Sequence, residues 1–405
     1  MPDVVDVAIV GAGLAGSALA AALAGRGIDV VVLERAPAWH WRAGGVFTSP
    51  AAVAALERTG LAASTIDAMT RPIPVLRLET EDGVIVPLTY GAERGGPTAV
   101  GFDRSALDPA LEALAIASGA TIRRGEAVTS VELDGRPGRI RRLRLGRDEL
   151  GARVVVGADG VHSIVAAAAG VARPARLSPR VGLTWHVRDT GPGGSRDGRL
   201  VVIRDGYVGL APVPGGRRNV GIVLGPAWRE RLARDGAAAT AQHVLATIRA
   251  VDDDPIRWAE AEPCERIAGA SPLGGRVTRR AGPGWFLVGD AAGFLDPFTG
   301  EGLHRALVST ELAADAIAAS LGFAGRAAAD VAAAYDRAMR RRFASKDAVS
   351  WLVQSFLGRP RLFEYAARRL AARPGVRGRM GLVMGDLVPA SRGLDPRFLA
   401  ALLVP

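Results

Sequence analysis

The first 34 residues carry the pattern that most narrows the folds open to this chain. A β-branched run, Val4–Val10, leads into Gly11-Ala12-Gly13-Leu14-Ala15-Gly16, an alanine-rich helical stretch and a second apolar run that ends in Glu34. In such a strand–turn–helix–strand unit, the glycines allow a tight turn, close backbone approach to a pyrophosphate and close packing of helix on strand, and the acid binds a ribose hydroxyl. The pattern predicts an α/β domain that binds a dinucleotide.

A second segment, near residue 290, fits the same kind of domain. The apolar run Trp285–Val288 ends in Gly289-Asp290, and a glycine- and proline-containing loop then leads to a helix expected to begin near Glu301. A short apolar run is typical of a buried strand, and a carboxylate at its C-terminal end faces the ligand crevice of an open α/β sheet. This segment therefore predicts a second contact with the same ligand.

A third motif lies between these two. The run Val154–Val156 leads into Gly157-Ala158-Asp159-Gly160-Val161-His162-Ser163. Together the three motifs resemble those of the FAD-dependent oxidoreductases of the class A flavin monooxygenase and geranylgeranyl-reductase-like superfamily, over about residues 3–320. The resemblance implies a Rossmann-like FAD-binding domain of the glutathione-reductase type, with an inserted antiparallel β-sheet substrate domain and C-terminal helices.

The resemblance also assigns roles in binding FAD. Asp290 would accept a hydrogen bond from a ribityl hydroxyl, and the loop and helix start that follow would offer backbone N–H groups to the flavin and the pyrophosphate. Arg42 and Arg104 match arginines that contact FAD. The implied cofactor-binding residues are Gly11, Gly13, Ala15, Gly16, Glu34, Arg35, Arg42, Arg104, Val128, Asp159, Gly160, Gly289, Asp290, Pro297, Gly300, Glu301, Gly302 and Leu303.

One position departs from the pattern of the superfamily. The hydroxylases usually carry an arginine three residues after the motif serine, where this chain has Ala166. An arginine there would provide a fixed cation for phosphate groups. The resemblance implies NAD(P)H as electron donor, but this departure weighs against direct reduction by NAD(P)H and leaves a separate redox partner open.

Three activities are compatible with such a flavoprotein. The most widespread chemistry of this fold predicts a monooxygenase that acts through a flavin C4a-hydroperoxide on O₂ and a hydrophobic, aromatic or polyketide-like molecule of secondary metabolism. The run Pro297–Gly302 instead favours an ene-reductase resembling the geranylgeranyl reductases, because hydroxylases more often have histidine after Gly-Asp-Ala-Ala. Ala166 supports the third, a flavin-binding protein that depends on a partner. None of them needs a protein nucleophile, since the cofactor performs the difficult step.

Several residues are candidates for the reacting side of the flavin. Pro297 and Phe298 are expected beside the flavin, and His186 is the best candidate for a general base. The candidates for the substrate pocket are Phe47, Trp185 and Tyr207, although ordinary core packing explains such residues as well. The spacing of His, Cys, Asp and Glu predicts no metal site.

The motifs predict a discontinuous domain organisation. Two inserted pieces are rich in short β-like runs and are expected to join as a mostly antiparallel sheet over the flavin. The predicted domains are an FAD-binding domain from 1–65, 101–175 and 270–325, a substrate-binding domain from 66–100 and 176–269, and a helical region from 326–405. A break in the helical region is expected at Arg373-Pro374-Gly375.

Composition and charge indicate a large enzyme with a small-molecule partner. No apolar stretch of about 18 residues is free of charge, so no transmembrane segment is predicted. The sequence also shows no basic leader and has a single cysteine, Cys264, and both observations favour a cytoplasmic location. The net charge is +10, but the 51 basic residues are spread along the chain and all except Lys346 are arginines. No nucleic-acid partner is predicted, because aromatic side chains do not interleave with the basic clusters.

Overall fold

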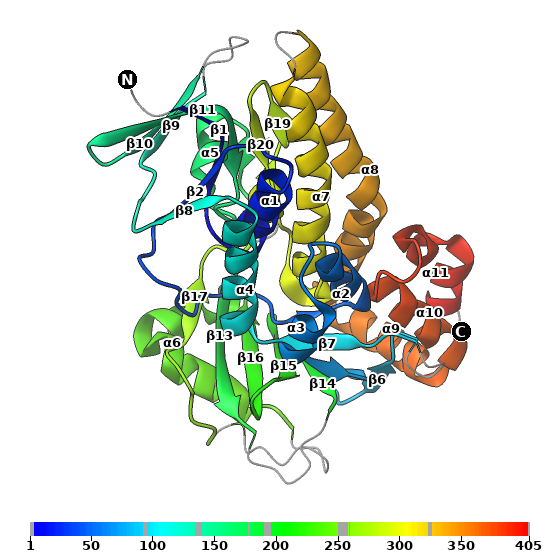
Figure 1. Ribbon diagram of the computed structural model, residues 1–405. Helices are drawn as coiled ribbons and strands as arrows, with labels where there is room; N and C mark the ends of the chain where they lie inside the picture. Colours follow the sequence, from blue (N-terminus) through cyan, green and yellow to red (C-terminus); the bar gives the residue numbers. More distant parts are fainter. Residues whose placement is uncertain are drawn as a thin grey trace.

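The first strand lies at the centre of a parallel sheet, as the N-terminal pattern predicts. The computed structural model describes residues 4–91, 96–133, 140–176, 179–189, 196–249, 258, 260–322 and 326–403. Strand β1 (Val4–Val10) pairs in parallel with β2 (Val30–Glu34) on one side and with β11 (Asp148–Gly157) on the other. Helix α1 (Leu14–Ala24) connects β1 to β2 and is buried on almost its whole surface between the sheet and helices α4 and α7 (Figure 1).

The strand order of this first sheet is β19-β20-β11-β1-β2-β8. Strands β9 and β10 extend the edge of β11 as an antiparallel excursion. The remaining strands of the sheet are β8 (Thr121–Arg124), β9 (Ser130–Glu132), β10 (Arg141–Leu145), β19 (Ala281–Gly282) and β20 (Trp285–Leu287). The Rossmann-like parallel sheet predicted from the sequence is confirmed.

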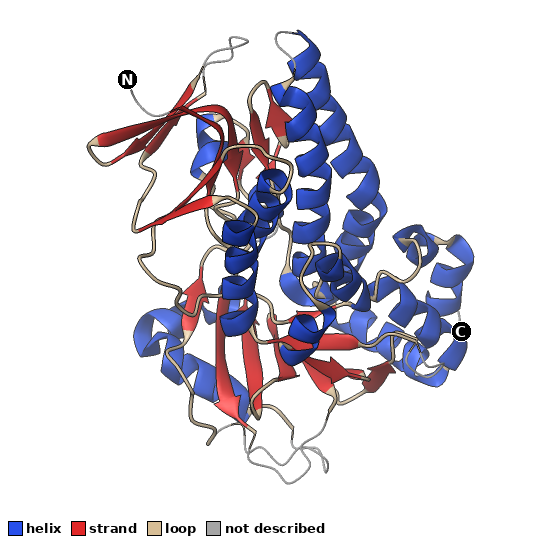
Figure 2. Ribbon diagram, in the orientation of Figure 1, coloured by secondary structure: helices blue, strands red, loops and turns tan. Residues whose placement is uncertain are grey.

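A second sheet of seven strands lies below the first in Figure 2, and its order is β17-β13-β16-β15-β14-β5-β6. Only the β14–β5 pair is parallel, and that pair joins two pieces of chain far apart in the sequence. The strands are β5 (Leu76–Glu79), β6 (Ile85–Leu88), β13 (Val181–Arg188), β14 (Gly198–Ile203), β15 (Gly206–Val213), β16 (Arg217–Leu224) and β17 (Ala268–Ala270). Helix α6 (Arg229–Ala246) covers the face of this sheet that points away from the first sheet.

Smaller elements join the two sheets. A three-stranded sheet contains β3 (Phe47–Thr48), β7 (Ala99–Phe102) and β4 (Thr70–Ile73), and β12 (Ala172–Arg173) pairs with β18 (Arg276–Val277). The short helices are α2 (Pro50–Glu57), α3 (Ala63–Ala68), α5 (Ile164–Ala168) and the 3₁₀ turns η2 (Pro226–Trp228), η3 (Gly289–Ala292), η4 (Pro297–Thr299) and η5 (Ala390–Leu394). The longer helix α4 (Arg104–Ala117) begins at Asp103, whose side chain accepts a hydrogen bond from the backbone N–H of Ser105.

The last third of the chain is helical. It contains α7 (Gly302–Leu321), α8 (Arg326–Leu357), α9 (Pro360–Ala372), α10 (Pro374–Met384) and α11 (Pro396–Leu403). The chain breaks at Arg373 as the sequence predicts, but Pro374 then opens α10, because proline lacks only an N–H that the first helical turn leaves unpaired. Helices α9 and α10 pack against β6, the edge strand of the second sheet. In the described part of the chain, no helix has the length and apolar character needed to cross a membrane.

Candidate active site

A cavity of about 740 Å³ lies between the two sheets, where β1, β2 and β11 end. It brings together the three motifs from the sequence: all of the residues implied to bind cofactor border it except Gly16 and Glu301. Phe47, Tyr207, Pro297 and Phe298 border it as well. Trp185 and His186 do not.

The glycine-rich loop leaves space where a pyrophosphate would bind. Gly11 has φ +102°, a conformation that favours glycine, and a Cβ at Gly16 would lie 1.9 Å from the carbonyl oxygen of Gly11. A Cβ at Gly13 would meet no protein atom within 4 Å. Gly13 is the N-cap of α1, whose first N–H groups have no partner within the helix. The loop therefore offers an open cradle and unpaired donors to an anionic group.

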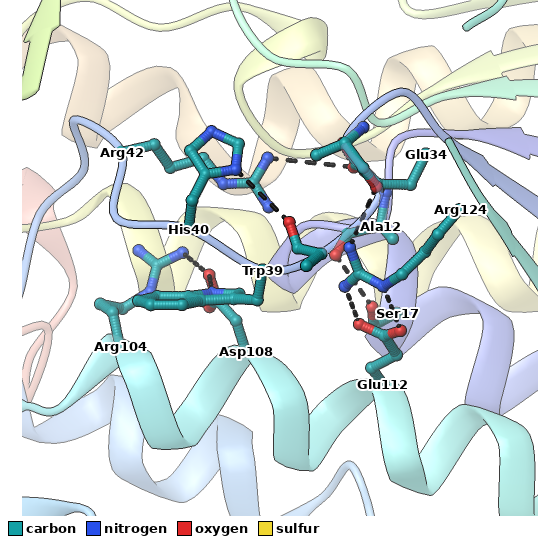
Figure 3. Close-up of polar contacts among 12 residues, drawn as sticks. Ala12, Ser17, Glu34, Trp39, His40, Arg42, Arg104, Asp108, Glu112 and Arg124 are labelled. Atoms are coloured by element: carbon teal, nitrogen blue, oxygen red, sulfur yellow. Dashed lines mark hydrogen bonds and ion pairs between the residues drawn. The ribbon is translucent and has the colours of Figure 1, made fainter. Parts of the chain in front are cut away.

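Glu34 is held in a fixed orientation at the end of β2. One carboxylate oxygen accepts a hydrogen bond from the N–H of Ala12 and the other from the N–H of Ala36, both at 3.0 Å, and the guanidinium of Arg42 lies 3.9 Å away (Figure 3). The residue is 3% exposed and borders the cavity. A carboxylate has further acceptor sites beyond these two bonds, which fits binding of a ribose hydroxyl.

Arg104 fixes the loop that passes over the cavity. Its guanidinium makes a bidentate pair with Asp108 at 2.8 and 3.0 Å and donates to the carbonyl of Gly45, and the indole of Trp39 donates to the same carboxylate (Figure 3). Burial lowers the pKa of Arg104, but the charge of Asp108 and its hydrogen bond outweigh burial and raise it. A permanent cation is thereby built into the cavity wall.

Two acids at the cavity have carboxylate oxygens without a hydrogen-bond partner among the described residues. The carboxylate of Asp290 is exposed to the cavity and, among the described residues, its side chain makes no hydrogen bond or ion pair. Burial among the surrounding protein raises its pKa, and Arg104 and Arg305 oppose that shift. One oxygen of Asp159 accepts from the N–H of Ile164 at 2.7 Å, and the other is buried with no partner in the described part of the chain. Both acids fit a ligand that brings hydroxyl donors, as FAD does.

Replacing Asp290 by asparagine tests the effect of burial on this acid. Because the folded-state pKa is raised above the ordinary value of 3.8, ionisation of Asp290 costs the FAD-free protein stability as the pH rises through its pKa. The stability of the FAD-free wild type should therefore fall relative to Asp290→Asn over that pH range, while the variant binds FAD more weakly. Thermal unfolding from about pH 3.5 upward, where the unfolded chain begins to ionise this group, measures the difference. A stability difference between the two proteins that does not change with pH would contradict the raised pKa of Asp290.

Trp185 and His186 lie on neighbouring positions of β13 but away from the cavity. Trp185 packs with Val208 and Val244 between the second sheet and α6. The ring of His186 is 2% exposed, its Nδ1 lies 2.8 Å from Glu265, and its centroid is 4.5 Å from that of Trp41. A general base must reach the reacting group directly or through one water, and this position gives His186 no such access.

Ala166 is also turned away from the cavity. It is 2% exposed in the core beside β11, and its N–H donates to the Oγ of Ser163, which caps α5. An arginine at this position would have to be accommodated in that core. The cations at the cavity wall are instead Arg35, Arg42 and Arg104, with Arg199 on the opposite side.

Glu301 points into a buried polar cluster rather than into the cavity. Its carboxylate accepts from Ser350 at 3.2 Å and lies 3.7 Å from the ammonium of Lys346. Lys346 also lies 2.8 Å from Asp386 and donates to the carbonyls of Val383 and Met384. Burial raises the pKa of Glu301, and Lys346 opposes the shift. Burial would also raise the pKa of Asp386, but the hydrogen bond from His304 and the charge of Lys346 hold it below its ordinary value.

A second ion pair holds the other end of the same loop. Asp296 accepts from the hydroxyl of Tyr207 and from Arg180, both at 2.7 Å, and from the N–H of Phe298 at 3.0 Å. Arg180 also donates to Gln354. The segment Asp296–Gly302, which presents Pro297 and Phe298 to the cavity, is thus anchored at both ends to α8. The sequence analysis missed Arg180, Asp296 and Lys346; the single lysine of the chain was the available signal.

The side of the cavity formed by the second sheet is mostly apolar. The guanidinium of Arg199 and the phenol of Tyr207, which border this side, already have protein partners. Arg199 forms a bidentate ion pair with Glu79 at 2.6 and 2.9 Å, and the hydroxyl of Tyr207 donates a hydrogen bond to Asp296. The aliphatic and aromatic lining residues on this side that belong to the apolar cluster around the cavity include Trp41, Leu76, Leu200, Val223 and Leu273. Among the described residues no cluster of His, Cys, Asp and Glu could hold a metal ion.

Comparison with known proteins agrees with this geometry. The family model described as an FAD binding domain matches residues 4–350. A menaquinone reductase of Mycolicibacterium smegmatis is 30% identical over 76% of this chain and 75% of its own length. The digeranylgeranylglycerophospholipid reductase 2 of Methanopyrus kandleri is 28% identical over 78% of this chain and 77% of its own length.

The fold has a close match among solved structures. The crystal structure of a flavoprotein/dehydrogenase from Cytophaga hutchinsonii has a TM-score of 0.77 and covers 97% of this chain and 95% of that chain. The sequence identity is 17%, so the likeness concerns the fold.

Proposed function

Because the chain belongs to the FAD binding domain family and is an FAD-dependent oxidoreductase, we propose that it is a reductase that saturates a carbon–carbon double bond in a polyprenyl chain. The observation that carries this proposal is the placement of an FAD cradle opposite a cavity wall that is mostly apolar. When bound, FAD supplies the hydride chemistry of such a reaction. The residues of the chain bind and orient the reactants and exclude water.

The apolar wall suits a hydrocarbon chain. Gly209 and Gly221 are directly paired on neighbouring strands and both border the cavity. A Cβ at either glycine would have no neighbour closer than 3.9 Å, so the pair leaves additional room in the wall. Burying apolar surface in such a cavity is the main favourable contribution to binding a substrate without polar groups.

The flavin side of the cavity is rigid. Glu301 ties one end of the loop that carries Pro297 and Phe298 to α8 through Ser350, and Asp296 ties the other end to α8 through Arg180 and Gln354. The ring of Tyr207 packs edge-on against Phe298 at 5.0 Å. Burial, followed by the charge of Asp296, raises the pKa of Tyr207 well above its ordinary value, so its hydroxyl remains protonated. We propose that Pro297 and Phe298 position the double bond against the flavin.

The names of the relatives support the same choice. Menaquinone and digeranylgeranylglycerophospholipids both carry polyprenyl chains, and the relatives named for them match over about three quarters of this chain. In the run Pro297–Gly302, which favours this branch in the sequence, Pro297, Phe298, Gly300 and Gly302 border the cavity. The second candidate is the monooxygenase, which the same mostly apolar cavity supports because an apolar lining would help protect oxygen chemistry from water. For either activity we propose NAD(P)H or a separate redox protein as electron donor.

The two candidates differ in what they add to the substrate. The FAD-loaded protein is reduced anaerobically with NADPH, or with dithionite where NADPH leaves the flavin band unchanged, and is then given menaquinone or a digeranylgeranylglycerophospholipid in detergent. We expect reoxidation of the flavin without O₂, and a product that, after any quinol is reoxidised in air, is still heavier by two hydrogen atoms per saturated bond. A product heavier by one oxygen atom, formed only in air, would establish the monooxygenase instead.

A cavity-filling variant links that activity to the apolar wall. Gly209→Leu should project into the cavity and lower turnover of the polyprenyl probe by about tenfold or more, the effect of roughly 1.4 kcal/mol of lost binding, while FAD content stays unchanged. Gly269→Leu is the matched control, since Gly269 lies in the same sheet but does not border the cavity. Equal loss in both variants would show that the effect comes from the sheet and not from the cavity.

A further inference from the structure

The C-terminal helices carry most of the excess positive charge of the protein. Residues 358–405 contain nine of the 51 basic residues and three of the 41 acidic ones, so the other 42 basic residues are nearly balanced by 38 acids. Five exposed arginines of this region form no ion pair with any acidic side chain in the described part of the chain; they are Arg359, Arg361, Arg379, Arg392 and Arg397. They lie on or at the start of α9, α10, η5 and α11, elements that contact one another, and we call these five arginines, together with Tyr365, the basic face.

One helix of this region presents basic and aromatic side chains along a single exposed stripe. On α9, Arg361, Tyr365 and Arg368 are exposed and recur every three or four residues, which places them on one side of the helix. The side chain of Arg368 lies 3.4 Å from that of Asp82, so the turn before β6 is beside α9. Tyr365 and Ile85, the first residue of β6, are 38% and 41% exposed. Two large, partly exposed side chains, Tyr365 and Ile85, thus lie near the arginines of α9.

The opposite side of α9 packs into a core cluster that also contains residues bordering the cavity. Ala366, Ala367 and Leu370 are buried in the same apolar cluster as Leu200 and Phe298, which border the cavity. Figure 1 shows α9, α10 and α11 gathered on one side of the molecule, next to β6. On α9, a single helix therefore separates exposed Arg361 and Tyr365 from the core cluster that includes cavity-lining residues.

Another arginine cluster of the chain differs in its charge balance. On β10, Arg142 is paired in register with Glu132 on β9, and Arg144 with Glu149 on β11. Opposite charges in directly facing positions of a sheet attract each other and neutralise the local field. The arginines of the basic face have no such partners among the described residues, so their field extends into solvent.

We propose that the basic face docks the protein on a bilayer that contains anionic phospholipid. Each arginine close to such a surface contributes favourably to binding, and tyrosine is suited to the interface between headgroups and acyl chains. The role of this docking rests on the proposed function, since a polyprenyl lipid resides in a membrane and must be delivered to the cavity. The binding itself requires no turnover.

The test uses the full FAD-loaded chain and vesicles of defined composition. Flotation with phosphatidylglycerol vesicles should recover the wild type, whereas phosphatidylcholine vesicles should not, and binding should weaken as salt screens the charges. The variant Arg361→Gln/Arg392→Gln/Arg397→Gln should lower affinity for the anionic vesicles by about 100-fold. The control Arg142→Gln/Arg144→Gln/Arg147→Gln removes the same number of exposed charges from the β10 region and should keep nearly full affinity.

Several results would overturn the docking proposal. One is failure of the wild type to float with phosphatidylglycerol vesicles, and another is binding to phosphatidylcholine vesicles as tight as binding to phosphatidylglycerol vesicles. The third such result is a loss of affinity in the control triple variant as large as that in the first triple variant. Tighter binding of a short DNA duplex than of the vesicles, lost in the first triple variant, would assign the face to nucleic acid instead. Reduction of a detergent-solubilised polyprenyl probe is measured separately, so failure of docking leaves the proposed activity standing, and absence of that activity leaves the docking result standing.

Discussion

Lys346→Met should destabilise the protein by about 3–5 kcal/mol, the usual cost of removing one partner from a buried ion pair. Lys346 is 3% exposed, and its ammonium directs its three protons to Asp386 and to the carbonyls of Val383 and Met384. Without it, the carboxylates of Asp386 and Glu301 remain buried with their main cation removed. Urea unfolding of the FAD-free protein measures the loss. The loss should begin to shrink above the ordinary glutamate pKa of 4.5 as the pH falls, because in the variant the burial of both acids is no longer opposed by Lys346 and favours their neutral, protonated forms.

Two further variants separate the ion pair from a general effect on α8. Arg341→Met removes an exposed cation from the same helix and should change stability by less than about 0.5 kcal/mol. Adding Asp386→Asn to Lys346→Met should restore part of the stability, because it removes one of the uncompensated charges. A loss in Lys346→Met no larger than that in Arg341→Met would contradict the role of the cluster.

Gly16→Ala should lower the affinity for FAD by about 100-fold or more, the equivalent of roughly 3 kcal/mol. Alanine usually favours a helix over glycine, but here its Cβ would lie 1.9 Å from the carbonyl oxygen of Gly11. That neighbour is backbone, so the loop itself must move, and the cradle moves with it. Isothermal titration of the FAD-free protein with FAD gives the change in affinity directly.

Other glycines provide the controls for that experiment. Gly375 lies in α10, where a Cβ would meet no atom within 4 Å, so Gly375→Ala should leave both stability and FAD affinity unchanged. Gly13→Ala should also leave the FAD-free protein stable, but should weaken FAD binding, because its methyl group would occupy space left for the ligand. Wild-type FAD affinity in Gly16→Ala would show that the loop can yield without loss of the cradle.

The parts of the fold that could be predicted from the sequence are those set by local pattern. The β-branched run before Gly11, the spacing of the glycines and the acid at the end of β2 are local features with one common structural solution. The position of Asp290 at the cavity could be predicted for the same reason, because it lies three residues after the buried strand β20. The cavity brings these residues together without any long-range information beyond the order of the strands.

Side-chain direction and long-range pairing could not be predicted in this way. Strand alternation shows that Trp185 and His186 face opposite sides of the sheet, but not which elements cover each side. The motif places Glu301 at the start of a helix, yet its orientation depends on Lys346 in the next helix. Ala166 occupies the motif position at which the hydroxylases carry an arginine, and the sequence therefore indicated a missing cation. The fold places the side chain of Ala166 in the core.

The burial of Lys346 has a chemical consequence for the whole surface of the protein. Every other basic side chain of the chain is arginine or histidine, so the exterior offers no side-chain amine to acylating reagents. An amine-selective label could reach Lys346 only while α10 and the segment around Asp386 separate from α8. The rate at which this single side-chain amine is acylated should therefore report how often the C-terminal helices open, with no engineered probe.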